Sequence, residues 1–133
     1  PDQINAQKQY QDTALILASR RGEAEVVEDL LNTGAEINIR NMDGTNALWA
    51  ACVAESFAVA DVLLKQGADI DNQNDNGATV LMYAASTGKA EWVNYLLAAG
   101  ADPELRSLDD FTALELAADV ITLRVLKACC QEK

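Results

Sequence analysis

The sequence predicts an all-α repeat protein, a solenoid in which helix-turn-helix units stack side by side. A glycine–alanine pair recurs at intervals of 33 residues, starting at Gly34, Gly67 and Gly100. A leucine column and an alanine column keep the same interval. Their members are Leu15, Leu48, Leu81 and Leu114, and Ala18, Ala51, Ala84 and Ala117. A unit of this size cannot bury its apolar face alone, so stacking buries it and leaves a long outer surface.

Four repeats fill the 133 residues as a single domain, at approximately 1–33, 34–66, 67–99 and 100–133. Residues 1–7 align with residues 34–40, so the chain begins inside a repeat. This start indicates either a trimmed chain or a piece of a longer protein, and the sequence does not choose between them.

Each repeat is expected to open with a β-hairpin finger. Asp43-Gly44 and Asn76-Gly77 are pairs that suit the positive φ angles of tight hairpin turns. A short first helix follows, over residues 79–85 in the third repeat, where the hydroxyl of Thr79 can cap the helix start.

A glycine then ends the first helix, because glycine accepts the left-handed conformation that closes a helix. Second helices are predicted over residues 23–32, 56–65 and 89–98, where apolar residues follow helical spacing. Glu55 stands where the other repeats have Gly22 and Gly88. A non-glycine residue in this conformation costs roughly 1 kcal/mol, so the second repeat is expected to be locally looser.

These residues resemble the ankyrin repeat. The third repeat carries the matches Gly77, Thr79, Leu81, Ala84, Ala85 and Gly88. The second repeat ends in Gly67-Ala68-Asp69-Ile70-Asp71, and the resemblance covers essentially the whole chain. It implies an ankyrin solenoid whose helix pairs are joined by β-hairpin fingers, and a non-catalytic role in binding proteins. A tetratricopeptide array is the nearest rival, but it lacks the Gly-Ala-Asp endings and the hairpin turns.

The charge is strongly acidic, with a net value of −11 spread over all four repeats. Such a surface repels nucleic-acid phosphates and anionic membranes, and it steers basic partners toward it. The acidity can equally serve only to keep the protein soluble. No apolar run approaches the roughly 18 residues that a membrane span needs. We expect a protein partner, one that can carry a basic patch, and no nucleic acid, membrane or small-molecule substrate.

Residues that carry chemistry are scarce. The chain has no histidine, and its three cysteines show no Cys-x-x-Cys spacing. Residues 72–77 mimic half of a calcium loop, but Tyr83 stands where a bidentate glutamate is required. We therefore expect no enzyme activity and no catalytic, metal or cofactor-binding residues. Cys52 reads as a small core residue, and a reducing, cytoplasmic location is the simplest fit.

In ankyrin proteins, partners contact the finger tips and the exposed ends of the first helices, so the resemblance implies the equivalent positions here. These positions are Tyr10, Arg20, Arg21, Met42, Asp43, Trp49, Val53, Asp75, Asn76, Tyr83, Leu108 and Phe111. Met42 and Trp49 are expected at the centre of the binding strip. Trp49 can instead fill space in the core, a role that is favoured for Tyr83, and Phe111 can pack on the last repeat.

The leading hypothesis is a protein–protein interaction module or scaffold. A second is a regulatory or targeting ankyrin domain of a larger enzyme or channel, which the start inside a repeat favours. A third is a free-standing bacterial ankyrin protein that acts on host proteins. The sequence does not separate these three.

Overall fold

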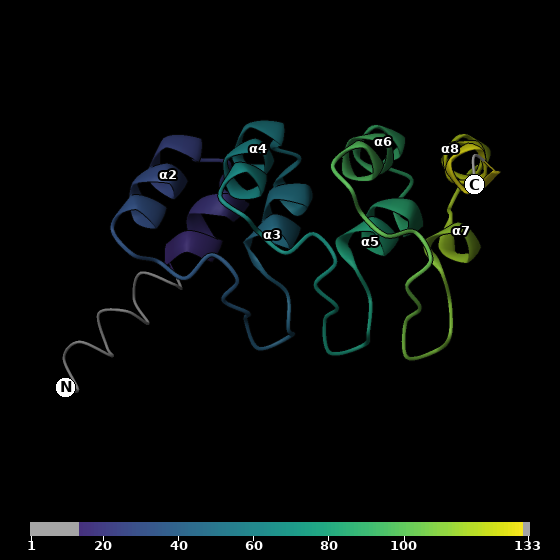
Figure 1. The fold of residues 1–133 in the computed structure, drawn as a ribbon, viewed down its shortest axis with the longest axis horizontal. Coiled ribbons are helices and arrows are strands. Elements are labelled where there is room, and N and C mark those ends of the chain that lie inside the picture. Colours follow the sequence, from purple (N-terminus) through teal and green to yellow (C-terminus); the bar gives the residue numbers. More distant parts are fainter. Residues whose placement is uncertain (1–13, 132–133) are drawn as a thin grey trace. The chain divides into compact units, whose positions relative to one another are not determined.

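The computed structural model describes residues 14–131, and within this range every regular element is a helix (Figure 1). The chain divides into two compact units, Pro1–Asp69 and Ile70–Lys133, called here the N-terminal half and the C-terminal half. None of the described helices is long and apolar enough to span a bilayer.

The N-terminal half contains a helix over residues 14–20 followed by α2 (Ala24–Asn32), α3 (Ala47–Ala54) and α4 (Phe57–Lys65). Helix α4 packs against both α2 and α3. Side chains that are completely buried, including Leu15, Val27, Val59 and Leu63, form its core.

The C-terminal half contains α5 (Val80–Ser86), α6 (Ala90–Ala98), α7 (Ala113–Leu116) and α8 (Val120–Gln131). Helices α5 and α6 pack as a pair, as do α7 and α8, while α5 lies beside α7 and α6 beside α8. This half is therefore two layers of helices. Its core includes Trp92, Val93 and Leu96, all on α6.

The 33-residue interval of the sequence reappears in the helix starts. Helices α2, α4 and α6 begin at Ala24, Phe57 and Ala90, and the first helices α3, α5 and α7 begin at Ala47, Val80 and Ala113. Each series advances by 33 residues at every step. The predicted second helices and the all-α repeat architecture are confirmed.

The first helices start where the sequence places a short polar side chain. Asn46, Thr79 and Thr112 each hold an extended backbone and accept a hydrogen bond from the N–H three residues later, at 3.2, 3.2 and 3.4 Å. The predicted cap at Thr79 is confirmed. At Thr112 the backbone N–H also donates to Glu115, which lowers the pKa of that carboxyl group. These caps satisfy N–H groups that have no partner inside the helix.

The fourth repeat departs from the others. Helix α7 is only 4 residues long, and the chain is extended again at Ala117. The N–H of Thr122 donates to Asp119 at 2.8 Å, which fixes the start of α8 and lowers the pKa of the Asp119 carboxyl group. Ile121, which aligns with Gly88, consequently lies inside α8, so this repeat has no left-handed residue at that position.

Alanine and leucine columns form the contact surfaces of the first helices. Leu15, Leu48 and Leu81 are at most 1% exposed, and Ala18, Ala51 and Ala84 are at most 5% exposed. Small residues at these positions let helices approach closely. Cys52 is completely buried, as expected for a core residue.

Glu55 adopts the left-handed conformation that its alignment with glycine predicts, with φ of 55° and ψ of 40°. Gly22 and Gly88 have φ of 72° and 70° at the equivalent positions. A side chain in this region crowds its own backbone, at a cost of roughly 1 kcal/mol.

Replacing Glu55 with glycine is therefore expected to raise the free energy of unfolding of the N-terminal half by about 0.5–1 kcal/mol. Chemical denaturation followed by circular dichroism measures the change. Glu55→Ala is the matched control, because it removes the carboxylate and retains the strained Cβ. If alanine stabilises the chain as much as glycine does, backbone strain is not the cause.

Candidate protein-binding surface

The loops that precede the first helices are short fingers, at residues 41–45, 74–78 and 107–111. In each, the N–H of the first residue donates to the carbonyl of the fifth at 2.9 Å. The N–H of the fourth residue donates to the carbonyl of the first at 2.8–3.0 Å. No strand is assigned within residues 14–131, so the β-hairpin form expected for the fingers is not confirmed. Each finger is a closed turn without a strand ladder.

Side chains just before the fingers brace them. Arg40 Nε donates to the carbonyl of Gly44, Gln73 Nε2 to that of Gly77, and Arg106 Nη1 to that of Asp110, each at 2.9 Å. These three donors occupy the same position of the 33-residue interval. Sequence reasoning missed them, although their common spacing directly before each turn was a usable signal.

The first side chain of each finger closes the turn from inside. The carboxamide oxygen of Asn41 accepts from the N–H groups of Asp43 and Thr45, both at 3.0 Å. Asn74 accepts in the same way from Asn76 and Ala78, both at 2.9 Å. A finger held by this many local bonds has little conformational freedom to lose when a partner binds.

The tips of these rigid turns carry exposed side chains. Met42 is 96% exposed, Leu108 is 78% exposed and Phe111 is 45% exposed. Asp43, Asp75 and Asn76 are also exposed. The expected tip residues of the described fingers are thus accessible. Tyr10, the remaining expected tip residue, lies outside the described residues.

Within the C-terminal half, two fingers are joined to each other. The N–H of Leu108 donates to the carbonyl of Asn76 at 2.9 Å, and Gln73 Nε2 donates to the carbonyl of Arg106 at 3.0 Å. The 74–78 and 107–111 fingers therefore present their tips as one piece. Two ion pairs of Arg106, to Asp110 and Glu115 at 3.6 and 3.5 Å, lie beside them on the surface.

Positions at the ends of the first helices divide into exposed and covered residues. Arg20, Arg21 and Val53 are exposed, and Val53 is 48% exposed. Tyr83 is half-buried on α5.

Trp49 requires a correction. Its side chain is only 8% exposed on α3, so the indole packs in the core and does not present its ring to a partner. Of the two roles considered for Trp49, filling space is the one that its burial supports. Met42 remains as the exposed apolar residue of the expected strip centre.

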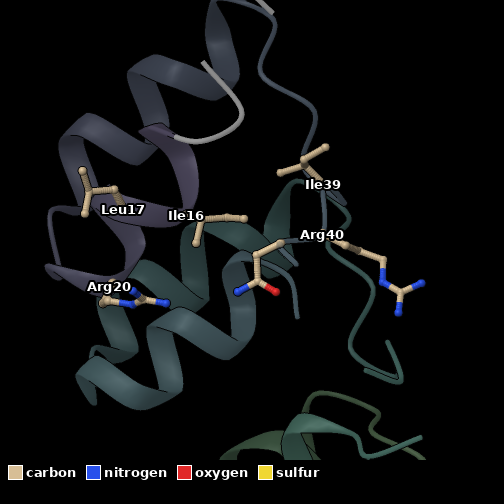
Figure 2. A pocket seen from close by; sticks show the side chains of 6 residues that line it. Ile16, Leu17, Arg20, Ile39 and Arg40 are labelled. Atoms are coloured by element: carbon tan, nitrogen blue, oxygen red, sulfur yellow. The ribbon is translucent and has the colours of Figure 1, made fainter. Parts of the chain in front are cut away.

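A surface hollow of about 310 Å³ lies between the helix over residues 14–20 and the segment that leads into the 41–45 finger (Figure 2). The described residues that line it are Ile16, Leu17, Arg20, Ile39, Arg40 and Asn41. Figure 2 shows Ile16 and Arg20, one helical turn apart, both directed toward the segment that carries Ile39 and Arg40. The hollow belongs entirely to the N-terminal half.

Comparison with protein families gives two matches. A model described as ankyrin repeats (3 copies) matches residues 1–74, which is more than half of the chain. The chain belongs to the ankyrin repeat family. A second ankyrin model, described as many copies, matches residues 63–117.

Among curated proteins, the chain is similar to the ankyrin repeat and KH domain-containing protein mask-1 of Caenorhabditis elegans. The two are 42% identical over 45 residues, which is 34% of this chain and 2% of that protein. The chain therefore spans a very small part of the length of this ankyrin relative.

Among residues 14–131, no group of three or more histidine, cysteine, aspartate or glutamate side chains could hold a metal ion. Ankyrin repeats are generally protein–protein interaction modules and are typically non-catalytic. What the observed surface offers chemically is shape, apolar contact and hydrogen bonding at rigid tips.

Proposed function

We propose that this chain is a protein-interaction module that binds a partner through its finger tips and the adjoining ends of its first helices. The observation that carries the proposal is Met42, which is 96% exposed on a turn fixed by the bonds of Asn41 and Arg40. Because so little of the Met42 side chain is buried within its own fold, nearly all of its apolar surface is available to a partner. A flexible thioether is also well suited to fill an irregular gap on a partner.

Charge defines the second property of the proposed partner. Asp43 follows Met42 at the tip, and Asp75 is exposed on the next finger along the chain. The chain as a whole has a net charge of −11. These acidic tips favour a partner protein that has basic side chains around the apolar site that receives Met42. They disfavour nucleic acids, anionic membranes and small anionic substrates.

Replacing Met42 with aspartate is expected to weaken binding of the partner at least tenfold, about 1.4 kcal/mol. The side chain makes no core contact, so the folded state stays intact. The measurement is affinity capture from the source cells, followed by titration of the recovered partner against both chains.

Val26→Asp is the matched control, because Val26 is an exposed apolar residue on α2, 41% exposed, and the charge change is the same. It is expected to bind like the unmodified chain. Equal affinity of the Met42 and Val26 variants would remove the finger tip from the binding surface.

A second proposal concerns the kind of protein in which this chain works. The similar segment of the relative described above lies within a far longer protein, of which this chain spans 2%. That small share supports the proposal that this chain works as the targeting or regulatory segment of a larger protein. Neither of the described cysteines Cys52 and Cys129 is in a disulfide, which supports a reducing compartment such as the cytoplasm.

A further inference from the structure

The hollow beside Ile16 differs in character from the finger tips, and its chemistry narrows what the proposed binding function recognises. The aliphatic side chains of Ile16, Leu17 and Ile39 line it, and Arg20 supplies a cationic group, while the Arg40 guanidinium is directed away from Ile16 (Figure 2). The inference below rests on the proposed protein-binding function and deepens it.

Cationic side chains are concentrated at this place. Residues 14–69 contain four, namely Arg20, Arg21, Arg40 and Lys65. Two of them line the hollow, and Arg21 is exposed directly beside it in sequence. The described lining residues include no acidic side chain, in a chain with an acidic excess in every repeat.

The two lining arginines have different roles. Arg40 donates through Nε to the carbonyl of Gly44, so its side chain is held along the finger. Arg20 is exposed, and no ion pair or hydrogen bond of its guanidinium is found within residues 14–131. Ile16 and Arg20 are one helical turn apart. An apolar side chain of a partner that packs against Ile16 therefore brings the next residue of that partner close to Arg20.

We propose that this hollow receives an aliphatic side chain of an extended partner segment whose next residues are acidic. The aliphatic group packs against Ile16, Leu17 and Ile39, and the carboxylate pairs with Arg20. Salt screens the repulsion between the partner's carboxylates and the more distant acidic side chains of this protein, because the Debye length is about 8 Å at physiological ionic strength. Contact charges at the hollow, rather than the net charge, therefore decide which flank is accepted.

The test uses three blocked synthetic hexapeptides that contain leucine followed by two glutamates, leucine followed by two lysines, or alanine followed by two glutamates. Each is titrated into the full 133-residue chain, with methyl and backbone NMR signals as the readout. The leucine–glutamate peptide is expected to shift the methyl signals of Ile16, Leu17 and Ile39 in a saturable way. The other two peptides are expected to bind at least tenfold more weakly.

Two charge-reversing variants sharpen the test. Arg20→Glu is expected to invert the order, so that the leucine–lysine peptide binds more tightly than the leucine–glutamate peptide. Lys65→Glu changes the net charge equally but lies in α4 and does not line the hollow, so it is expected to keep the original order.

Several results would overturn the proposal: no methyl shifts with any peptide, equal affinity for acidic and basic flanks, or the same response from both variants. Failure here is distinguishable from failure of the protein-binding function. If the partner is still lost in Met42→Asp while the peptides fail, the finger tips bind and the hollow does not recognise this motif. If Met42→Asp leaves partner binding unchanged, the finger-tip function fails independently.

Discussion

Replacement of Trp92 with alanine is expected to lower the free energy of unfolding of the C-terminal half by about 3–5 kcal/mol. Trp92 is 2% exposed on α6, the largest of the fully buried side chains. Its ring meets that of Tyr95 edge to face, with centroids 5.4 Å apart. Alanine removes the whole indole from a core made by only four helices, so the neighbours cannot close the cavity fully.

Chemical denaturation followed by far-ultraviolet circular dichroism measures this loss. Glu91→Ala is the matched control on the same helix, because Glu91 is exposed and its loss is expected to cost less than about 1 kcal/mol. Trp92→Phe should lie between the two, since it retains an aromatic ring. Similar midpoints for the alanine variants at positions 91 and 92 would contradict the assigned core.

Replacement of Gly77 with alanine is expected to destabilise the C-terminal half by about 2–4 kcal/mol, from backbone strain and overpacking together. Gly77 has φ of +76°, and a Cβ there would lie 2.7 Å from the backbone nitrogen of Leu108. That nitrogen donates to the carbonyl of Asn76 at 2.9 Å, so the added methyl group pushes apart the two fingers that this bond joins.

Gly100→Ala separates the two causes. Gly100 also has a positive φ, of +104°, but a Cβ there meets nothing within 4 Å. Its alanine variant is expected to lose only about 1 kcal/mol, from backbone strain. Thermal unfolding of both variants decides the matter: equal losses would mean that contact between the 74–78 and 107–111 fingers contributes nothing.

The helices could be predicted from the sequence because local and periodic signals agree. Capping residues stand at Asn46, Thr79 and Thr112, and apolar residues follow at helical spacing. Glycine, or Glu55 in its place, follows the first helices of three repeats in a left-handed conformation. Each of these is a property of a few neighbouring residues, and the 33-residue interval repeats it.

The exposure of Trp49 was not predictable from its own helix, because α3 is apolar on every side. A signal existed in its column, where Ile16 and Met82 are also apolar, and Met82 is 2% exposed. Trp49, at 8% exposed, is buried like Met82. Ile16, at the same position of the first repeat, is only half-buried and lines the surface hollow.

The hollow lies beyond what a repeat pattern can predict, and the braces could be found only from their common spacing. The side-chain hydrogen bond that braces each finger comes from two residue types, arginine at positions 40 and 106 and glutamine at position 73. Residue identity alone therefore does not reveal this role. The hollow depends on the space between the helix over residues 14–20 and the segment of residues 39–41, which only folding defines. A five-residue finger whose two ends are joined by a single backbone hydrogen bond is also too short to form strands.

The central claim is that partners meet this chain at its exposed finger tip, and photo-crosslinking tests it most directly. A photoreactive side chain is placed at the position of Met42 and, in a second variant, at that of Val26 on α2. Illumination in an extract of the source cells is expected to link a partner from position 42 only. An excess of unmodified chain should suppress that product. Equal crosslinking from both positions, or a product from position 26 alone, would contradict the account.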